Sequence, residues 1–183
     1  MATITNQAAL SYNGVTTLSN IAVGELVEVL TATKTAADTT YTAGGVKTFV
    51  ISLVNSSAAA LTGLTVTDTL GSYTFSGNTL YPLTYVTGSL LYYVNGALQA
   101  TPTVTATAPL TVTGVTVPAG GSAMLIYTAR VNEYAPLGVE DSITNTATIT
   151  GGGLTSSVTA TETINASPAP QLAISKSISP TMV

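Results

Sequence analysis

The chain has 183 residues, of which 45% are hydrophobic and only 7% are charged, with a formal net charge of −4. Lysine and arginine together number four, too few to neutralise phosphates, so we expect no nucleic-acid partner. Without cysteine or histidine, the chain has no disulfide, thiolate catalysis or zinc–thiolate site. The sequence lacks a run of about twenty apolar residues, which predicts no membrane-spanning helix. We expect no secretory signal peptide at residues 1–5.

The first predicted unit is an N-terminal extension, residues 1–25. Its segment 4–11, Ile-Thr-Asn-Gln-Ala-Ala-Leu-Ser, parallels segment 143–150, Ile-Thr-Asn-Thr-Ala-Thr-Ile-Thr, and a glycine-containing turn follows each copy. A segment repeated on both sides of an unrepeated body is typical of one period of a tandem array. We therefore expect strands in the extension that resemble the closing strand of the central domain.

The central domain is predicted at residues 26–165 and reads as strands. Apolar and polar residues alternate in 46–54, 64–69 and 122–132, which is typical of half-buried antiparallel strands. Asn95-Gly96 is the favoured two-residue hairpin turn between 90–94 and 97–99. Strands at about ten-residue spacing with such breaks predict an all-β sandwich.

A proline-containing linker and a detached strand are predicted over residues 166–183. Within 171–179, apolar side chains alternate with small ones, and a lone strand of this kind needs an acceptor sheet. Donation of the strand to another copy is a non-closing contact and builds a filament. The predicted donation interface comprises Leu172, Ala173, Ile174, Ser175, Lys176 and Ile178, with Ile4, Ala8 and Leu10. The alternatives are that both end strands fold back on their own sandwich, or that the tail belongs to a truncated neighbouring domain.

A second candidate site is an internal isopeptide bond, which some surface β-domains form between lysine and asparagine or aspartate beside a catalytic carboxyl. Lys34 on an early strand, Asn145 on a late strand and Asp68 between them have the required chemistry. In the alternative interpretation Lys34 faces solvent, Asn145 bonds backbone in a turn, and Asp68 caps a loop. We expect no enzyme, no cofactor and no metal site, and no acidic spacing resembles a calcium loop.

The tyrosines of residues 78–98 support an alternative function, an adhesive module that recognises carbohydrate or a host protein. Packing in the core and at its rim is the more frequent role for such a cluster. The cluster comprises Tyr81, Tyr85, Tyr92 and Tyr93.

Three segments resemble a conserved repeat of prokaryotic surface proteins, the domain of unknown function numbered eleven. They are 46–70, which contains Val-Thr-Asp-Thr-Leu; 143–149, which reads Ile-Thr-Asn-Thr-Ala-Thr-Ile; and the opening motif at 172–180. The resemblance covers one full copy, about 29–150, with partial copies at both ends. It implies an immunoglobulin-like sandwich outside the cell, without enzymatic activity. With the predicted strand donation, we expect a homopolymeric structural subunit of an extracellular, cell-surface or spore-surface filament.

Overall fold

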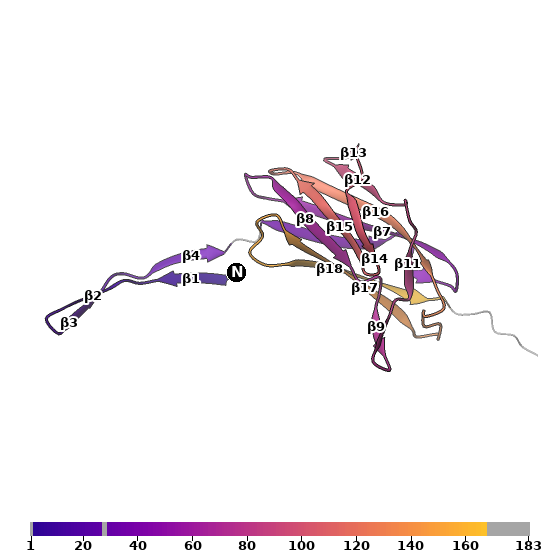
Figure 1. The fold of residues 1–183 in the computed structure, drawn as a ribbon, viewed down its shortest axis with the longest axis horizontal. Helices are drawn as coiled ribbons and strands as arrows, with labels where there is room; N and C mark the ends of the chain where they lie inside the picture. The colour runs from indigo at the N-terminus through magenta and orange to yellow at the C-terminus, as the bar shows by residue number, and fades with distance from the viewer. Residues whose placement is uncertain (1, 27–28, 168–183) are drawn as a thin grey trace, which may run out of the picture.

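The structure, a computed structural model, describes residues 2–26 and 29–167, and these residues form strands and turns without a helix. The main body is built from two six-stranded sheets that pack face to face (Figure 1). None of the described residues forms a helix with the length and apolarity needed to cross a membrane. The predicted class, an immunoglobulin-like antiparallel β-sandwich with extra N-terminal strands, is confirmed for this part of the chain.

The first sheet has β16 (Ser122–Val131) and β7 (Val46–Asn55) at its centre and β5 (Leu30–Ala36) at one edge. On the other side, β11 (Leu83–Tyr85) and β12 (Leu91–Val94) pair with successive parts of β16. A hairpin joins β12 to β13 (Ala97–Gln99), and its turn residues Asn95 and Gly96 have φ of +48° and +79°. The predicted Asn-Gly hairpin is thereby confirmed.

The second sheet has the order β14-β15-β8-β17-β18-β6. Its pairings are antiparallel, except that the two-residue β6 lies parallel to β18. The strands are β14 (Thr103–Thr107), β15 (Leu110–Val117), β8 (Leu61–Asp68), β17 (Ser142–Gly151), β18 (Val158–Ala166) and β6 (Thr40–Tyr41).

The core lies between the inward faces of the two sheets, where alternate residues are buried. In β16 the buried positions are Ala123, Leu125, Tyr127, Ala129 and Val131, while the residues between them are half-buried or exposed. β7 buries Phe49, Ile51 and Leu53 on the same principle, and β8 buries Leu64, Val66 and Asp68. The predicted alternation of half-buried strands is therefore confirmed here.

The N-terminal extension forms a separate β-ribbon (Figure 1). β1 (Ala2–Asn6) pairs with β4 (Ala22–Leu26), and β2 (Ala9–Tyr12) pairs with β3 (Val15–Leu18), each as a two-stranded antiparallel sheet. The extension was predicted to contain strands, and it contains two pairs of them. A further small hairpin, β9 (Tyr73–Phe75) with β10 (Asn78–Leu80), projects from the sandwich.

Candidate functional site: a buried lysine, aspartate and asparagine

Four polar or charged residues are buried among the described residues: Lys34, Asn55, Asp68 and Asn145. Asn55 stabilises a turn, since its side-chain nitrogen donates to the carbonyl oxygens of Ala59 and Pro118 at 2.8 and 3.0 Å. The other three meet at one place in the interior. Burying a charge is unfavourable unless it is paired, so the buried Lys34 and Asp68 are expected to have partners within this cluster.

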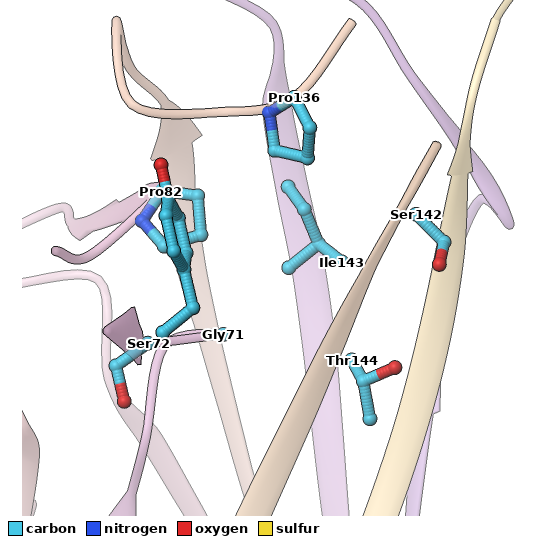
Figure 2. Close-up of a pocket in the computed structure, with 8 residues that line it drawn as sticks. Gly71, Ser72, Pro82, Pro136, Ser142, Ile143 and Thr144 are labelled. Atoms are coloured by element: carbon cyan, nitrogen blue, oxygen red, sulfur yellow. The ribbon is translucent and has the colours of Figure 1, made fainter. Parts of the chain in front are cut away.

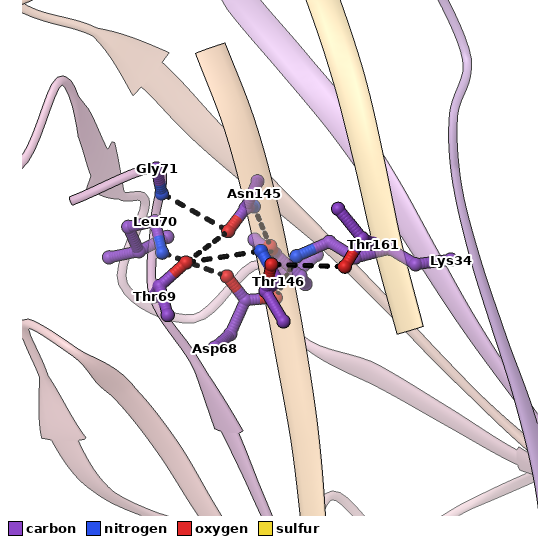
Figure 3. A network of polar contacts seen from close by, with 9 residues as sticks. Lys34, Asp68, Thr69, Leu70, Gly71, Asn145, Thr146 and Thr161 are labelled. Carbon is purple, nitrogen blue, oxygen red and sulfur yellow. Dashed lines mark hydrogen bonds and ion pairs between the residues drawn. The ribbon is translucent and has the colours of Figure 1, made fainter. Parts of the chain in front are cut away.

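The three side chains come from both layers of the sandwich. Lys34 lies in the middle of β5 in the first sheet, while Asp68 ends β8 and Asn145 lies in β17, two neighbouring strands of the second sheet. Lys34 shares the inward face of its strand with the core residue Leu30, and Asn145 shares its face with Ile143 and other core residues. The lysine side chain therefore crosses the space between the sheets (Figure 3).

The carboxylate of Asp68 is the centre of the network. Its Oδ2 accepts hydrogen bonds from Lys34 Nζ and, at 2.7 Å, from the hydroxyl of Tyr127. Its Oδ1 accepts from the backbone N–H of Leu70 at 3.0 Å. Asn145 Nδ2 donates to the same Tyr127 hydroxyl at 3.0 Å. One hydroxyl thus links the carboxylate to the amide nitrogen of Asn145.

The carbonyl oxygen of Asn145 faces two donors. The backbone N–H of Gly71 lies 3.2 Å from Oδ1, and the hydroxyl of Thr69 lies 3.3 Å from it. The same Thr69 oxygen accepts from the N–H of Thr146 at 3.1 Å, which leaves its own hydrogen available for Asn145. Two donors aimed at an amide oxygen withdraw electrons from its carbon and stabilise the negative charge that nucleophilic attack places on the oxygen.

Burial makes the neutral form of Lys34 easier to reach than it is in water. Burial lowers the pKa of Lys34 below its ordinary value, and the nearby Asp68 charge opposes this effect without reversing it. The aromatic rings of Phe49 and Tyr127 lie 5.3 and 6.0 Å from Nζ, and, like Asp68, their faces attract the charged ammonium. Burial also raises the pKa of the Tyr127 hydroxyl, helped by the Asp68 charge, so that hydroxyl keeps its proton. A neutral lysine amine is a nucleophile, whereas an ammonium is not.

The site therefore combines a nucleophile, a proton acceptor and a polarised amide carbonyl in a water-poor interior. Those are the components of acyl transfer from an asparagine side chain to a lysine amine. The sequence-predicted residues Lys34, Asp68 and Asn145 lie together. The alternative in which Lys34 faces solvent is wrong, because only 4% of the residue is exposed. The other two predictions of that alternative, that Asp68 caps a loop and Asn145 bonds backbone in a turn, are compatible with the site. Asp68 and Asn145 each also accept a hydrogen bond from a backbone N–H.

Sequence reasoning did not find Tyr127, Thr69 or Gly71. The signal for Tyr127 was its inward position in an apolar face, where a hydroxyl needs a hydrogen-bonding partner. Thr69 and Gly71 lie within three residues after Asp68, but their contacts to Asn145 depend on how β8 and β17 align. That register is not readable from either strand alone.

The predicted donation residues at the N-terminus lie in the ribbon. Leu10 is 73% exposed in β2 and Ala8 is exposed just before it, whereas Ile4 lies in β1 opposite Gly24. β1 and β2 therefore pair with strands of the same ribbon, not with the sandwich. The predicted C-terminal residues, Leu172 to Ile178, lie outside the described residues, and donation stays a prediction.

The tyrosine cluster contributes to the core. Tyr85 and Tyr92 are each 6% exposed, and the hydroxyl of Tyr92 donates to the carbonyl of Thr116 at 2.5 Å. Tyr81 is half-buried and packs against the same core. Only Tyr93 lacks a place in that core, although it too is half-buried. The cluster serves mainly to hold β11 and β12 on the sandwich.

A surface pocket borders the buried site (Figure 2). It presents hydroxyl groups and apolar carbons, and its lining contains no carboxylate or amine. Across residues 2–26 and 29–167, no three carboxylate side chains gather closely enough to hold a metal ion. The pocket is lined by Gly71, Ser72, Tyr73, Pro82, Pro136, Ser142, Ile143 and Thr144.

Position 71 requires glycine, both for its backbone conformation and because a side chain would have no room there. Its φ is +71°, and a Cβ at this position would lie 2.3 Å from Cγ2 of Ile143. Gly71→Ala is expected to lower the free energy of unfolding by about 3 kcal/mol, because the change adds a clash to an unfavourable backbone conformation. Gly77→Ala is the matched control: φ is +80°, but a Cβ there meets nothing within 4 Å. It should cost only about 1 kcal/mol in denaturant titrations. Equal losses in the two variants would contradict the assigned packing.

Comparison with known proteins identifies solved structures that share the fold of this chain. No family model matches the chain, and no curated protein matches it. Solved structures do match, at identities that establish a shared sandwich fold and nothing more. The chain is similar to pilin subunits and to a domain of an adhesin.

Three of these structures are informative. BcpA, the major pilin subunit of Bacillus cereus, matches with a TM-score of 0.53 and 17% identity over 88% of this chain and 47% of its own. The pilus backbone RrgB of Streptococcus pneumoniae gives 0.51 and 14%, over 66% and 31%. The N-terminal domain of the Streptococcus gordonii adhesin Sgo0707 gives 0.53 and 14%, over 83% and 35%. The chain thus spans less than half of the length of each.

Proposed function

We propose that the protein is a structural subunit of an extracellular or spore-surface filament, and that an amide bond between Lys34 and Asn145 locks its sandwich. The observation that carries the proposal is the buried assembly of Lys34, Asp68 and Asn145 across the two sheets. The fold shared with a pilus backbone and a major pilin supports the structural role. The resemblance to the surface repeat family numbered eleven supports the same class of protein.

The proposed reaction balances without a co-reactant. The Lys34 ammonium first gives a proton to Asp68, and the neutral amine attacks Cγ of Asn145. The new Nζ–Cγ bond forms while negative charge collects on Oδ1, between the Gly71 N–H and the Thr69 hydroxyl. Protonated Asp68 supplies a proton for Nδ2 and then takes one from the attacking nitrogen. The Cγ–Nδ2 bond breaks, and one ammonia leaves.

The bond would change how the sandwich carries tension. Lys34 lies in the first strand of the sandwich and Asn145 in the next to last, so a pull on the two ends passes through the cross-link. Residues 35–144 would then lie outside the path of force. In a non-covalent sandwich the same pull would act on the backbone hydrogen bonds of the edge strand β5. A covalent bond between the layers therefore suits a subunit of a fibre that bears load.

We further propose that subunits join head to tail by donation of strand 171–179. The scarcity of charge supports association through strands, because charged edges are a main defence against it. The N-terminal ribbon adds exposed apolar side chains that a partner would cover. They are Leu10, Tyr12, Val15, Leu18, Ile21 and Val23.

Replacing Leu172, Ile174 and Ile178 with serine is expected to convert polymers into monomers, because the change removes the apolar side of the donated strand. Light scattering measures this conversion. The matched control changes residues of the other face that lie outside the predicted interface, Ser177→Thr and Ser179→Thr, and should leave assembly intact. Deletion of residues 168–183 should act like the serine variant. A full-length chain that is monomeric at high concentration would contradict the filament, and a monomer that binds carbohydrate would favour the adhesive alternative.

A further inference from the structure

The remaining question at the site is how a proton reaches the leaving nitrogen of Asn145. In the part of the chain that the structure describes, Asp68 makes no direct hydrogen bond to Asn145. Its Oδ2 receives Lys34 Nζ and the Tyr127 hydroxyl, and its Oδ1 receives the N–H of Leu70. The hydroxyl of Tyr127 is the group that contacts both Asp68 Oδ2, at 2.7 Å, and Asn145 Nδ2, at 3.0 Å.

We propose that Tyr127 is a catalytic residue of the cross-linking reaction and that its hydroxyl relays the proton from Asp68 to Nδ2 of Asn145. This inference rests on the proposed Lys34–Asn145 bond. Tyr127 comes from β16 in the first sheet, whereas Asp68 and Asn145 come from the second. Closing the sandwich therefore assembles the relay together with the nucleophile.

The relay works by reversing two hydrogen bonds. Before reaction, the Tyr127 hydroxyl donates to Asp68 and accepts from the planar amide nitrogen of Asn145. Attack makes that nitrogen tetrahedral and gives it a lone pair, while Asp68 now carries a proton. Asp68 can then donate to the tyrosine oxygen as the tyrosine donates to Nδ2. The hydroxyl ends with one proton, as it began, and ammonia is released.

The position of Tyr127 suits a relay better than a simple structural contact. The residue is 1% exposed and its ring stacks on Phe49 with centroids 5.5 Å apart, so the hydroxyl has little freedom to turn elsewhere. Its proton is firmly held, since burial raises the pKa of the phenol. A relay group must keep a proton between transfers, and a neutral phenol meets that requirement.

The test compares Tyr127→Phe with Tyr92→Phe. Tyr92 is also buried and its hydroxyl is also hydrogen-bonded, but its partner is the backbone carbonyl of Thr116, and among the described residues no hydrogen bond joins it to Asp68 or Asn145. Full-length chains are synthesised in a short pulse, and the loss of one ammonia is followed over time by intact mass spectrometry. We expect Tyr127→Phe to lose ammonia at least about tenfold more slowly, and Tyr92→Phe to match the wild type.

The outcomes separate the two proposals. If the wild type keeps its full mass, the cross-link fails, and the relay fails with it. If the wild type loses ammonia and Tyr127→Phe does so equally fast, the relay alone is wrong.

Both phenylalanine variants are checked for a cooperative unfolding transition. Should Tyr127→Phe lack one, a fluorotyrosine placed at position 127 keeps the ring and hydroxyl but makes the phenol more acidic. A changed rate then supports the relay, and an unchanged rate overturns it.

Discussion

Replacing Asn145 by alanine is expected to leave the chain with its full mass and to lower its free energy of unfolding by about 5 kcal/mol. The cross-link would close a loop of residues 35–144, and closing a loop of roughly 100 residues stabilises a fold by about 4 to 5 kcal/mol in the chain-entropy account of disulfides. The variant also removes the hydrogen-bonding partner of the Gly71 N–H, which adds about 1 kcal/mol or more. Intact mass and denaturant titration measure the two effects together.

The matched control for this change is Asn6→Ala. Asn6 stands in the same Ile-Thr-Asn context as Asn145, but it is exposed at the end of β1, opposite Ala22. Its replacement should leave both the mass and the stability within error of the wild type. If Asn6→Ala and Asn145→Ala behaved alike, the special chemistry assigned to Asn145 would be wrong.

The second large effect is expected for Asp68→Asn, which keeps the shape of the side chain and removes its charge. Lys34 would then have no proton acceptor in the site, and cross-linking should slow by about 100-fold or more. A chain that stays uncross-linked would also hold a buried lysine without its ion pair, a change that typically destabilises by about 3 to 5 kcal/mol. Mass spectrometry should find the unmodified chain, and thermal unfolding should move to a much lower temperature.

Asp38→Asn serves as its control. Asp38 also pairs with a lysine, with its Oδ2 3.5 Å from Nζ of Lys47, but its side chain is 71% exposed. Exposed ion pairs contribute little, so this variant should lose less than about 1 kcal/mol and should still release ammonia. Rapid ammonia loss in Asp68→Asn would remove Asp68 from the proposed mechanism.

Much of the fold could be predicted because alternate residues of a strand point to opposite faces, so a half-buried strand shows apolar residues with a period of two. Alternation in 46–54 predicted a half-buried strand, and Phe49, Ile51 and Leu53 are buried together on one face of it. The turn at Asn95-Gly96 was predictable for a local reason, because both residues must adopt positive φ. The internal pairing of the N-terminal ribbon was only partly predicted, since alternation does not say which strands pair.

The candidate site likewise has residues that could be predicted from the sequence and residues that could not. The residue types and strand positions of Lys34, Asp68 and Asn145 were sufficient to propose their chemistry. The supporting groups were not predictable, because Tyr127 reaches the site across the sheet interface and Gly71 reaches it through the alignment of β8 with β17. Such contacts are properties of the packed sandwich. A pattern within one strand carries no information on them.

The most direct test of the account is the mass of the intact wild-type protein, followed by fragmentation of its proteolytic peptides. We expect a mass lower than that of the sequence by one ammonia, and a branched peptide in which Lys34 is joined to Asn145. Loss of one water, with Lys34 joined to Asp68, would show that the bond forms with Asp68 and would contradict the proposed Lys34–Asn145 bond. A protein with the full mass of its sequence would contradict the cross-link outright.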